Sequence, residues 1–137
     1  MKIWIYSIII SMSLLSPAIA QDRKNNIESV KAAFITQKLE LTPEESQKFW
    51  PVYNSYQQEL RKLVLIKNSQ RRALKENAGT APVDELEIDS EILELRKRYR
   101  HEFTKVLPRQ KAAMVYPAER EFRQQLIEQL QKRKKKN

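Results

Sequence analysis

A helix-opening sequence occurs twice in this chain, once in a complete form and once in a reduced form. In the complete copy, Thr42 can cap a helix through its hydroxyl, Pro43 suits the first helical position, and Glu45 can return a hydrogen bond to the cap. The reduced copy keeps a proline at Pro108 and a glutamine at Gln110, without a hydroxyl side chain before the proline. Two such starts in one chain predict two related helical halves.

The rest of the chain also favours helices, because it has a single glycine among 137 residues and many Leu, Lys, Glu, Gln and Arg. Apolar residues recur at steps of three and four, the spacing of one helical face. We predict helices at residues 26–41, 42–77, 84–107 and 108–131, with a linker at 78–82. The second helix would be about 54 Å long, more than a compact domain of this size spans. We therefore expect an all-α protein whose four helices form two long hairpins in an extended, curved cradle.

The first 20 residues are typical of an export signal. They contain a lysine, an almost uncharged apolar run, and an Ala-x-Ala site directly before Gln21. The apolar run is shorter than the about 20 residues that span a bilayer, so we expect a cleaved signal peptide at 1–20 and not a retained anchor. The expected mature protein is periplasmic, with one helical domain at 21–131 and a disordered basic tail at 132–137.

The balance of charges limits the kinds of partner. The chain carries 26 basic and 17 acidic side chains, a net charge of +9, and no cysteine. A basic surface favours acidic partners. In an exported protein these are anionic lipids, envelope polymers or acidic client chains, so we do not expect nucleic acid as a partner. The lack of cysteine excludes disulfides and thiolate metal sites, so stability must come from packing.

The sequence offers little for catalysis or for a cofactor. It has one histidine, His101, no glycine-rich phosphate loop, and no arrangement that indicates a catalytic triad. The acidic residues at 84–94 are explained by the helix dipole, which favours negative charge at a helix start. We therefore expect no enzymatic activity, no cofactor and no metal site.

The two helix openings resemble the paired Leu-Thr-x-x-Gln motifs of the Spy/CpxP family of small periplasmic helical proteins. The first motif has Glu45 in place of the glutamine, and the second has Leu107 in place of the threonine. The phrases at 49–53 and 118–123 are similar to those of a Bacteroidetes-type branch, often labelled sensors linked to extracytoplasmic sigma factors. The residues that carry the motifs are Leu41, Thr42, Pro43, Glu45, Leu107, Pro108 and Gln110.

The resemblance implies a four-helix cradle, usually a homodimer, that binds unfolded or partly folded proteins without ATP or damps an envelope-stress sensor. Amphipathic helices too long to bury themselves in a monomer would leave apolar surface for such clients. The candidate client surface comprises Phe49, Trp50, Tyr53, Tyr56, Arg71, Arg72 and Lys75. The aromatic residues could instead be the core between helices, and the basic residues a solvated face. The sequence leaves both interpretations open.

Two other functions remain as alternatives to a chaperone. One is a regulatory interaction protein that binds the ectodomain of a sensor or an anti-sigma factor through the same concave face. The other is binding to a membrane surface, because the basic residues at 132–136 follow an amphipathic stretch at 122–130.

Overall fold

The computed structural model describes residues 18–76 and 85–136, which are entirely helical apart from two short connections. The helices are α2 (Ala18–Lys38), α3 (Pro43–Glu76), α4 (Glu85–Val106) and α5 (Arg109–Lys136). The predicted all-α class with four helices is therefore confirmed. Residues 1–17 of the predicted signal peptide and the predicted linker at 78–82 lie outside the described residues.

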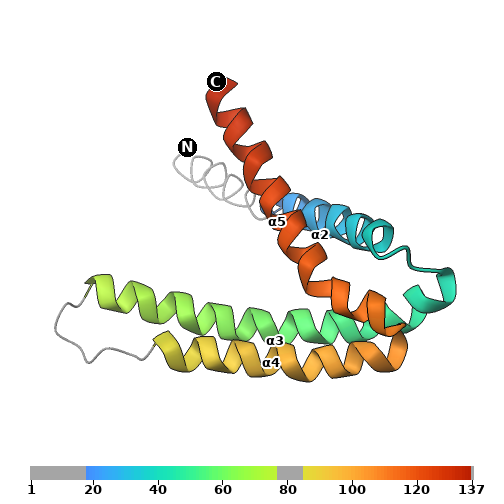
Figure 1. Ribbon diagram of the computed structural model, residues 1–137. Coiled ribbons are helices and arrows are strands. Elements are labelled where there is room, and N and C mark those ends of the chain that lie inside the picture. Colours follow the sequence, from blue (N-terminus) through green and yellow to red (C-terminus); the bar gives the residue numbers. More distant parts are fainter. Residues whose placement is uncertain (1–17, 77–84, 137) are drawn as a thin grey trace, which may run out of the picture.

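Helices α3 and α4 form one long antiparallel hairpin, and α2 and α5 pair with each other above it (Figure 1). The first turns of α5 lie along the hairpin, and the rest of the helix rises away and crosses α2 (Figure 1). Pro117 lies inside α5, where a missing amide and a bulky ring favour a change of direction. The second helix pair thus joins the first and last described helices instead of two consecutive ones.

The predicted capping box opens α3. The Thr42 amide donates to Glu45 Oε2 at 2.9 Å, and the Glu45 amide donates to Thr42 Oγ1 at 3.2 Å. Pro43 is the first residue of the helix, and Pro51 lies inside it without ending it. All residues of this cap lie within one helical turn, so the sequence alone predicts where α3 begins.

The connection between α2 and α3 is a tight turn built around Glu40, whose φ of 49° lies in the left-handed region. The Glu40 amide donates to the Gln37 carbonyl at 3.1 Å, and the Leu41 amide donates to the Thr36 carbonyl at 3.0 Å. These two bonds form a Schellman motif, in which glycine is the usual residue at the position of Glu40. Helix α2 therefore ends at Lys38, close to the predicted end at residue 41.

The start of α2 differs from the sequence prediction. The sequence predicts that the first helix begins at Asn26, but α2 begins at Ala18 and Asn26 lies inside it. Residues 18–25 contain neither glycine nor proline, so the helix has no local reason to begin later. The C-terminal end also differs, because α5 continues to Lys136 through residues predicted to be disordered. Lysine and arginine are good helix formers, and their charge suits a helix C-terminus.

The two helix-opening motifs meet in space. Helix α5 starts without a hydroxyl cap, and the Pro108 carbonyl accepts its first bond, from the Ala112 amide at 3.0 Å. Lys111, on the first turn of α5, donates to Glu45 Oε2 at 2.7 Å and to the Glu40 carbonyl at 2.6 Å. The hydrogen bond from Lys111, followed by that from the Thr42 amide, lowers the pKa of the Glu45 carboxyl below its usual value. Lys111, which directly follows the second motif, therefore stabilises the turn and the capping box at the first motif.

Aromatic side chains from α3 and α4 form the core of the hairpin. Phe49 lies 5.5 Å from Phe103, and Tyr56 lies 5.4 Å from Tyr99, measured between ring centroids. Residues from the rest of the chain complete the core: Ile35 from α2, Leu39 from the turn after α2, and Ala112, Val115 and Ala118 from α5. One continuous core therefore joins all four helices at the end of the hairpin where the two connections lie.

Candidate functional site

The clearest candidate binding site is an apolar groove between α2 and α5, with a volume of about 630 Å³. We call it the α2–α5 groove. Its apolar lining residues are Ile27, Val30, Phe34, Phe122, Leu126 and Leu130. The three on α2 are spaced by three and four residues, and the three on α5 by four and four, so each set lies on one face of its helix.

The groove is closed at one end and open at the other. At the closed end the rings of Phe34 and Phe122 pack 5.6 Å apart, measured between centroids. Towards the open end, Ile27, Val30 and Leu130 are 44%, 53% and 50% exposed. Large aliphatic side chains that remain half exposed on two facing helices form a contiguous patch of the kind that binds other proteins.

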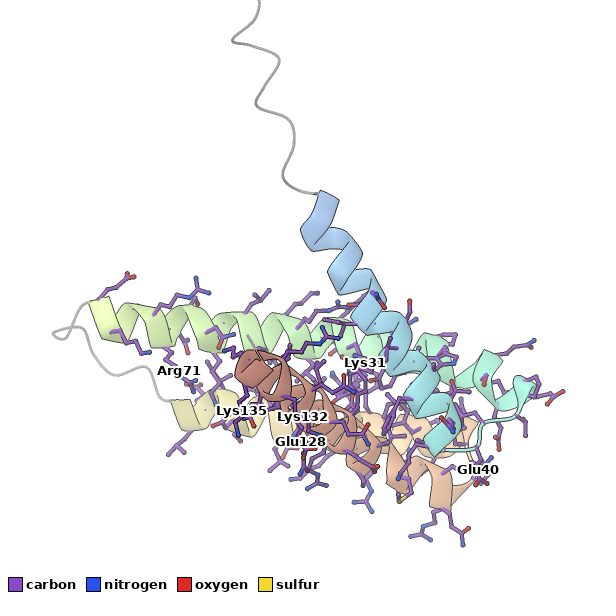
Figure 2. The ribbon with its side chains drawn as sticks, turned by 90° about the horizontal axis from the view of Figure 1, so that it is seen from above. Lys31, Glu40, Arg71, Glu128, Lys132 and Lys135 are labelled. Atoms are coloured by element: carbon purple, nitrogen blue, oxygen red, sulfur yellow. The ribbon has the colours of Figure 1, made fainter. Side chains whose placement is uncertain are left out.

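Charged residues surround this apolar surface. Lys38 and Glu121 form an ion pair across the closed end at 2.9 Å. The last turns of α5 carry exposed cations, with Lys132 and Lys135 projecting from the end that points away from the hairpin (Figure 2). An apolar groove with a basic open end suits an apolar chain segment that also carries acidic residues.

A buried polar cluster fixes α5 to the hairpin and thereby determines the shape of the groove. Its centre is Glu119, which is only 9% exposed. Glu119 accepts hydrogen bonds from the Tyr53 hydroxyl at 2.7 Å, from Gln57 Nε2 at 2.6 Å and from the Tyr56 hydroxyl at 3.4 Å. We call these residues the Glu119 cluster. Burial and then the Glu119 charge raise the pKa of Tyr53 above its ordinary value and raise the pKa of Tyr56 to about 12.

Helix α2 joins the same cluster through Lys31. Its ammonium donates to Gln57 Oε1 at 3.2 Å and lies 5.6 Å from the centroid of the Tyr53 ring. Burial lowers the pKa of Lys31, and the nearby Glu119 carboxylate opposes that effect. Helices α2, α3 and α5 therefore meet at one set of hydrogen bonds, which sets the angle at which the α2–α5 pair leaves the hairpin.

Sequence reasoning did not identify Glu119, although the sequence contains a signal for it. Glu119 is spaced four residues from Val115 and three from Phe122, so it occupies a core position of the apolar pattern of α5. A carboxylate at such a position requires buried hydrogen-bond donors. The tyrosines of α3 supply them, and only the folded arrangement shows that they are in reach.

The structure corrects part of the predicted client surface. Phe49, Tyr53 and Tyr56 are buried in the core, so they are not available to a client. Trp50 is partly buried and packs against Phe49 and Tyr53, with centroid distances of 5.1 Å and 5.3 Å. These residues form interhelical core because α4 and α5 both pack onto the face of α3 that carries them.

The basic part of the predicted client surface lies elsewhere. Arg71, Arg72 and Lys75 are exposed near the far end of α3, and Arg71 lies close to the outer end of the hairpin (Figure 2). The predicted aromatic and basic residues therefore do not form one surface.

The described residues contain no group of three or more His, Asp or Glu side chains placed to hold a metal ion. His101 is exposed on α4, and its carbonyl accepts a hydrogen bond from the Thr104 hydroxyl at 2.6 Å. Among residues 18–76 and 85–136, no helix has the length and apolar character needed to cross a membrane.

Comparison of the chain with protein-family models, with curated proteins and with solved structures finds no match.

Proposed function

We propose that this protein is an ATP-independent chaperone that holds apolar segments of unfolded proteins in the α2–α5 groove. The observation that carries the proposal is the half-exposed aliphatic surface of Ile27, Val30 and Leu130, which faces an open groove between two helices. A segment bound there would cover apolar surface that the folded chain leaves in water. Such burial is favourable by about 25 cal/mol per Å² of apolar area.

Two further features support a reversible holdase. The groove is wide and its outer half is aliphatic, so it accepts many apolar side chains without selecting one shape. The basic end of α5 would attract acidic client segments before apolar contact is made. The resemblance of the two helix openings to the Spy/CpxP motifs is consistent with this function, and membership of that family is part of the proposal.

The proposal includes where the protein works and in what form. We propose that residues 1–20 direct export and are removed, so that the mature chain acts in the periplasm, where ATP is not supplied. We also propose that two copies associate, which would join two α2–α5 grooves into a larger client-binding surface.

The proposed function is tested by suppression of aggregation. The mature chain is mixed with several chemically unrelated unfolded clients, and light scattering is followed as a function of chaperone concentration. Suppression at near-stoichiometric ratios for most clients is expected. If no client is protected, the chaperone proposal is wrong.

Groove variants locate the activity. The triple variant Ile27→Gln, Val30→Gln, Leu130→Gln replaces exposed side chains, so it is expected to fold. It should need at least about tenfold more protein for equal protection, because the loss of apolar contact should weaken binding by about 1.4 kcal/mol or more.

The matched control replaces three exposed apolar residues of the hairpin, Leu65, Ile66 and Leu93, with glutamine. Protection should stay within about twofold of the parent. Equal loss in both triple variants would show that the activity does not reside in the α2–α5 groove.

A further inference from the structure

A second groove lies on another side of α5, between α4 and α5, with a volume of about 560 Å³. We call it the arginine groove. The lining residues that matter here are Arg96 from α4 and Tyr116, Glu119, Arg120, Arg123 and Ile127 from α5. The groove extends along α5 from Tyr116 to Gln131, which at 1.5 Å per residue is roughly 22 Å. That length accommodates a short peptide segment.

One arginine of this groove, Arg96, contacts Tyr116 through both its guanidinium and its backbone carbonyl. The Arg96 guanidinium carbon lies 6.0 Å from the centroid of the Tyr116 ring, and the Tyr116 hydroxyl donates to the Arg96 carbonyl at 2.7 Å. Within the part of the chain that the structure describes, Arg96 Nε is buried and has no hydrogen-bond partner. Because this nitrogen is buried, Arg96 contributes to the groove through its positive charge and not through this N–H.

The other two arginines have charges that the fold does not neutralise. Arg120 and Arg123 are exposed, and neither forms an ion pair with a described residue. Several other cations on α4 and α5 do have carboxylate partners, as Lys97 with Glu94, Lys105 with Glu102 and Lys111 with Glu45 show. The arginine groove therefore carries positive charge that is not balanced by ion pairs.

The groove is lined by three arginines and two glutamates, so its acidic residues offset only part of the positive charge. The Glu119 oxygens accept hydrogen bonds from Tyr53, Tyr56 and Gln57 of the Glu119 cluster, so they are already in use. Glu128 lies further along α5, close to Lys132 (Figure 2), and it accepts a bond from Gln124 at 3.4 Å. The arginine end of the groove is the part available to an anion.

We propose that the arginine groove binds the carboxylates of acidic peptide segments, so that clients rich in both acidic and apolar residues are the preferred substrates. This inference rests on the proposed function, because the peptide would be a segment of an unfolded client. Guanidinium groups bind carboxylates through paired N–H donors, which gives both strength and geometry. The two grooves flank α5, so one client chain could place apolar side chains in the first and acidic side chains in the second.

The proposal is tested with two labelled peptides of equal length. One alternates leucine and glutamate, and the other has glutamine in place of every glutamate. Fluorescence anisotropy should show that the mature chain binds the acidic peptide at least about tenfold more tightly at low salt, with the difference shrinking as salt increases. Equal affinity for the two peptides would overturn the proposal.

Paired arginine variants separate this groove from general attraction between opposite charges. Arg120→Gln with Arg123→Gln should abolish most of the preference for the acidic peptide. The control is Arg100→Gln with Arg109→Gln, which removes the same charge from another basic groove of about 570 Å³ on the same two helices. The control should keep the preference within about twofold. Equal loss in both pairs would contradict a specific site.

Further outcomes separate failure of the arginine-groove proposal from failure of the chaperone proposal. If anionic phospholipid vesicles or inorganic phosphate bind through Arg120 and Arg123 while the acidic peptide does not, the groove binds phosphate and the proposal fails. Failure of the chaperone proposal would be seen in the aggregation assay and not in peptide binding. Loss of aggregation suppression with intact peptide binding would reject the chaperone and keep the groove, whereas suppression without an acidic preference would reject only the groove.

Discussion

Replacement of Glu119 by alanine should destabilise the fold strongly, because the Glu119 cluster joins α5 to the hairpin. The substitution leaves the buried Tyr53 hydroxyl and the partly buried Gln57 amide without their acceptor, and each such loss costs about 1–3 kcal/mol. With two such losses, we expect a total cost of about 3–5 kcal/mol. Since a domain is stable by only about 5–15 kcal/mol, this is a large part of the whole.

Urea unfolding followed by helical circular dichroism measures the effect. If the free energy of unfolding falls by about 1.5 kcal/mol per M of urea, the urea concentration at the unfolding midpoint should fall by about 2–3 M. The matched control is Glu121→Ala, two residues away on α5, which removes an exposed ion pair with Lys38. That change should cost no more than about 1 kcal/mol. Equal losses in the two variants would refute the structural role given to Glu119.

A double-mutant cycle tests the same reasoning at one hydrogen bond. Tyr53→Phe should cost about 1–2 kcal/mol in the parent, where the hydroxyl donates to Glu119. In the Glu119→Ala background the same change should cost much less, because the hydroxyl has already lost its acceptor. Equal costs in both backgrounds would show that the two residues act independently.

Three further predictions follow from local features and use the same denaturation assay. Thr42→Ala should lose about 1 kcal/mol because it removes the α3 cap, and Thr42→Ser should restore most of it; a neutral Thr42→Ala would contradict the capping box. Glu40→Gly should gain about 0.5–1 kcal/mol, because Glu40 has a positive φ that glycine adopts without strain; a loss would show that the side chain itself stabilises the turn. The tyrosines should contribute no pH dependence while they are protonated in both states. Above about pH 10, where tyrosines of the unfolded chain ionise, stability should decline as the pH rises towards the folded pKa of Tyr56, about 12. Tyrosinate absorbance should therefore appear together with unfolding, and ionisation of all tyrosines in the folded state would contradict their burial.

Features that depend on a few neighbouring residues could be predicted from the sequence. The capping box at Thr42 and Glu45 uses atoms within one turn, so the sequence contains all that it needs. The end of α2 and the break at Pro108 are local for the same reason. The apolar spacing in α3 and α4 also predicts which faces pack, although it did not show whether Tyr53 and Tyr56 face the core or a client.

The features that carry the proposed function depend on how the helices are placed in space. The α2–α5 groove exists because the first and last described helices cross, and no pattern within either helix specifies that crossing (Figure 1). The Glu119 cluster brings residues of three helices to one carboxylate. An arginine that forms an ion pair is less able to bind an acidic ligand. Ion pairs such as Arg98 with Glu59 join residues that are far apart in the sequence. Such contacts require tertiary geometry, which single-sequence patterns do not contain.

Site-specific photo-crosslinking tests most directly whether clients bind in the α2–α5 groove. A photoreactive residue is placed at Val30 in the groove or at Leu93 on the hairpin, two aliphatic positions that are 53% and 52% exposed. With an unfolded client present, strong crosslinks at position 30 and weak ones at position 93 are expected. Equal crosslinking at both positions, or crosslinking only at 93, would contradict the account.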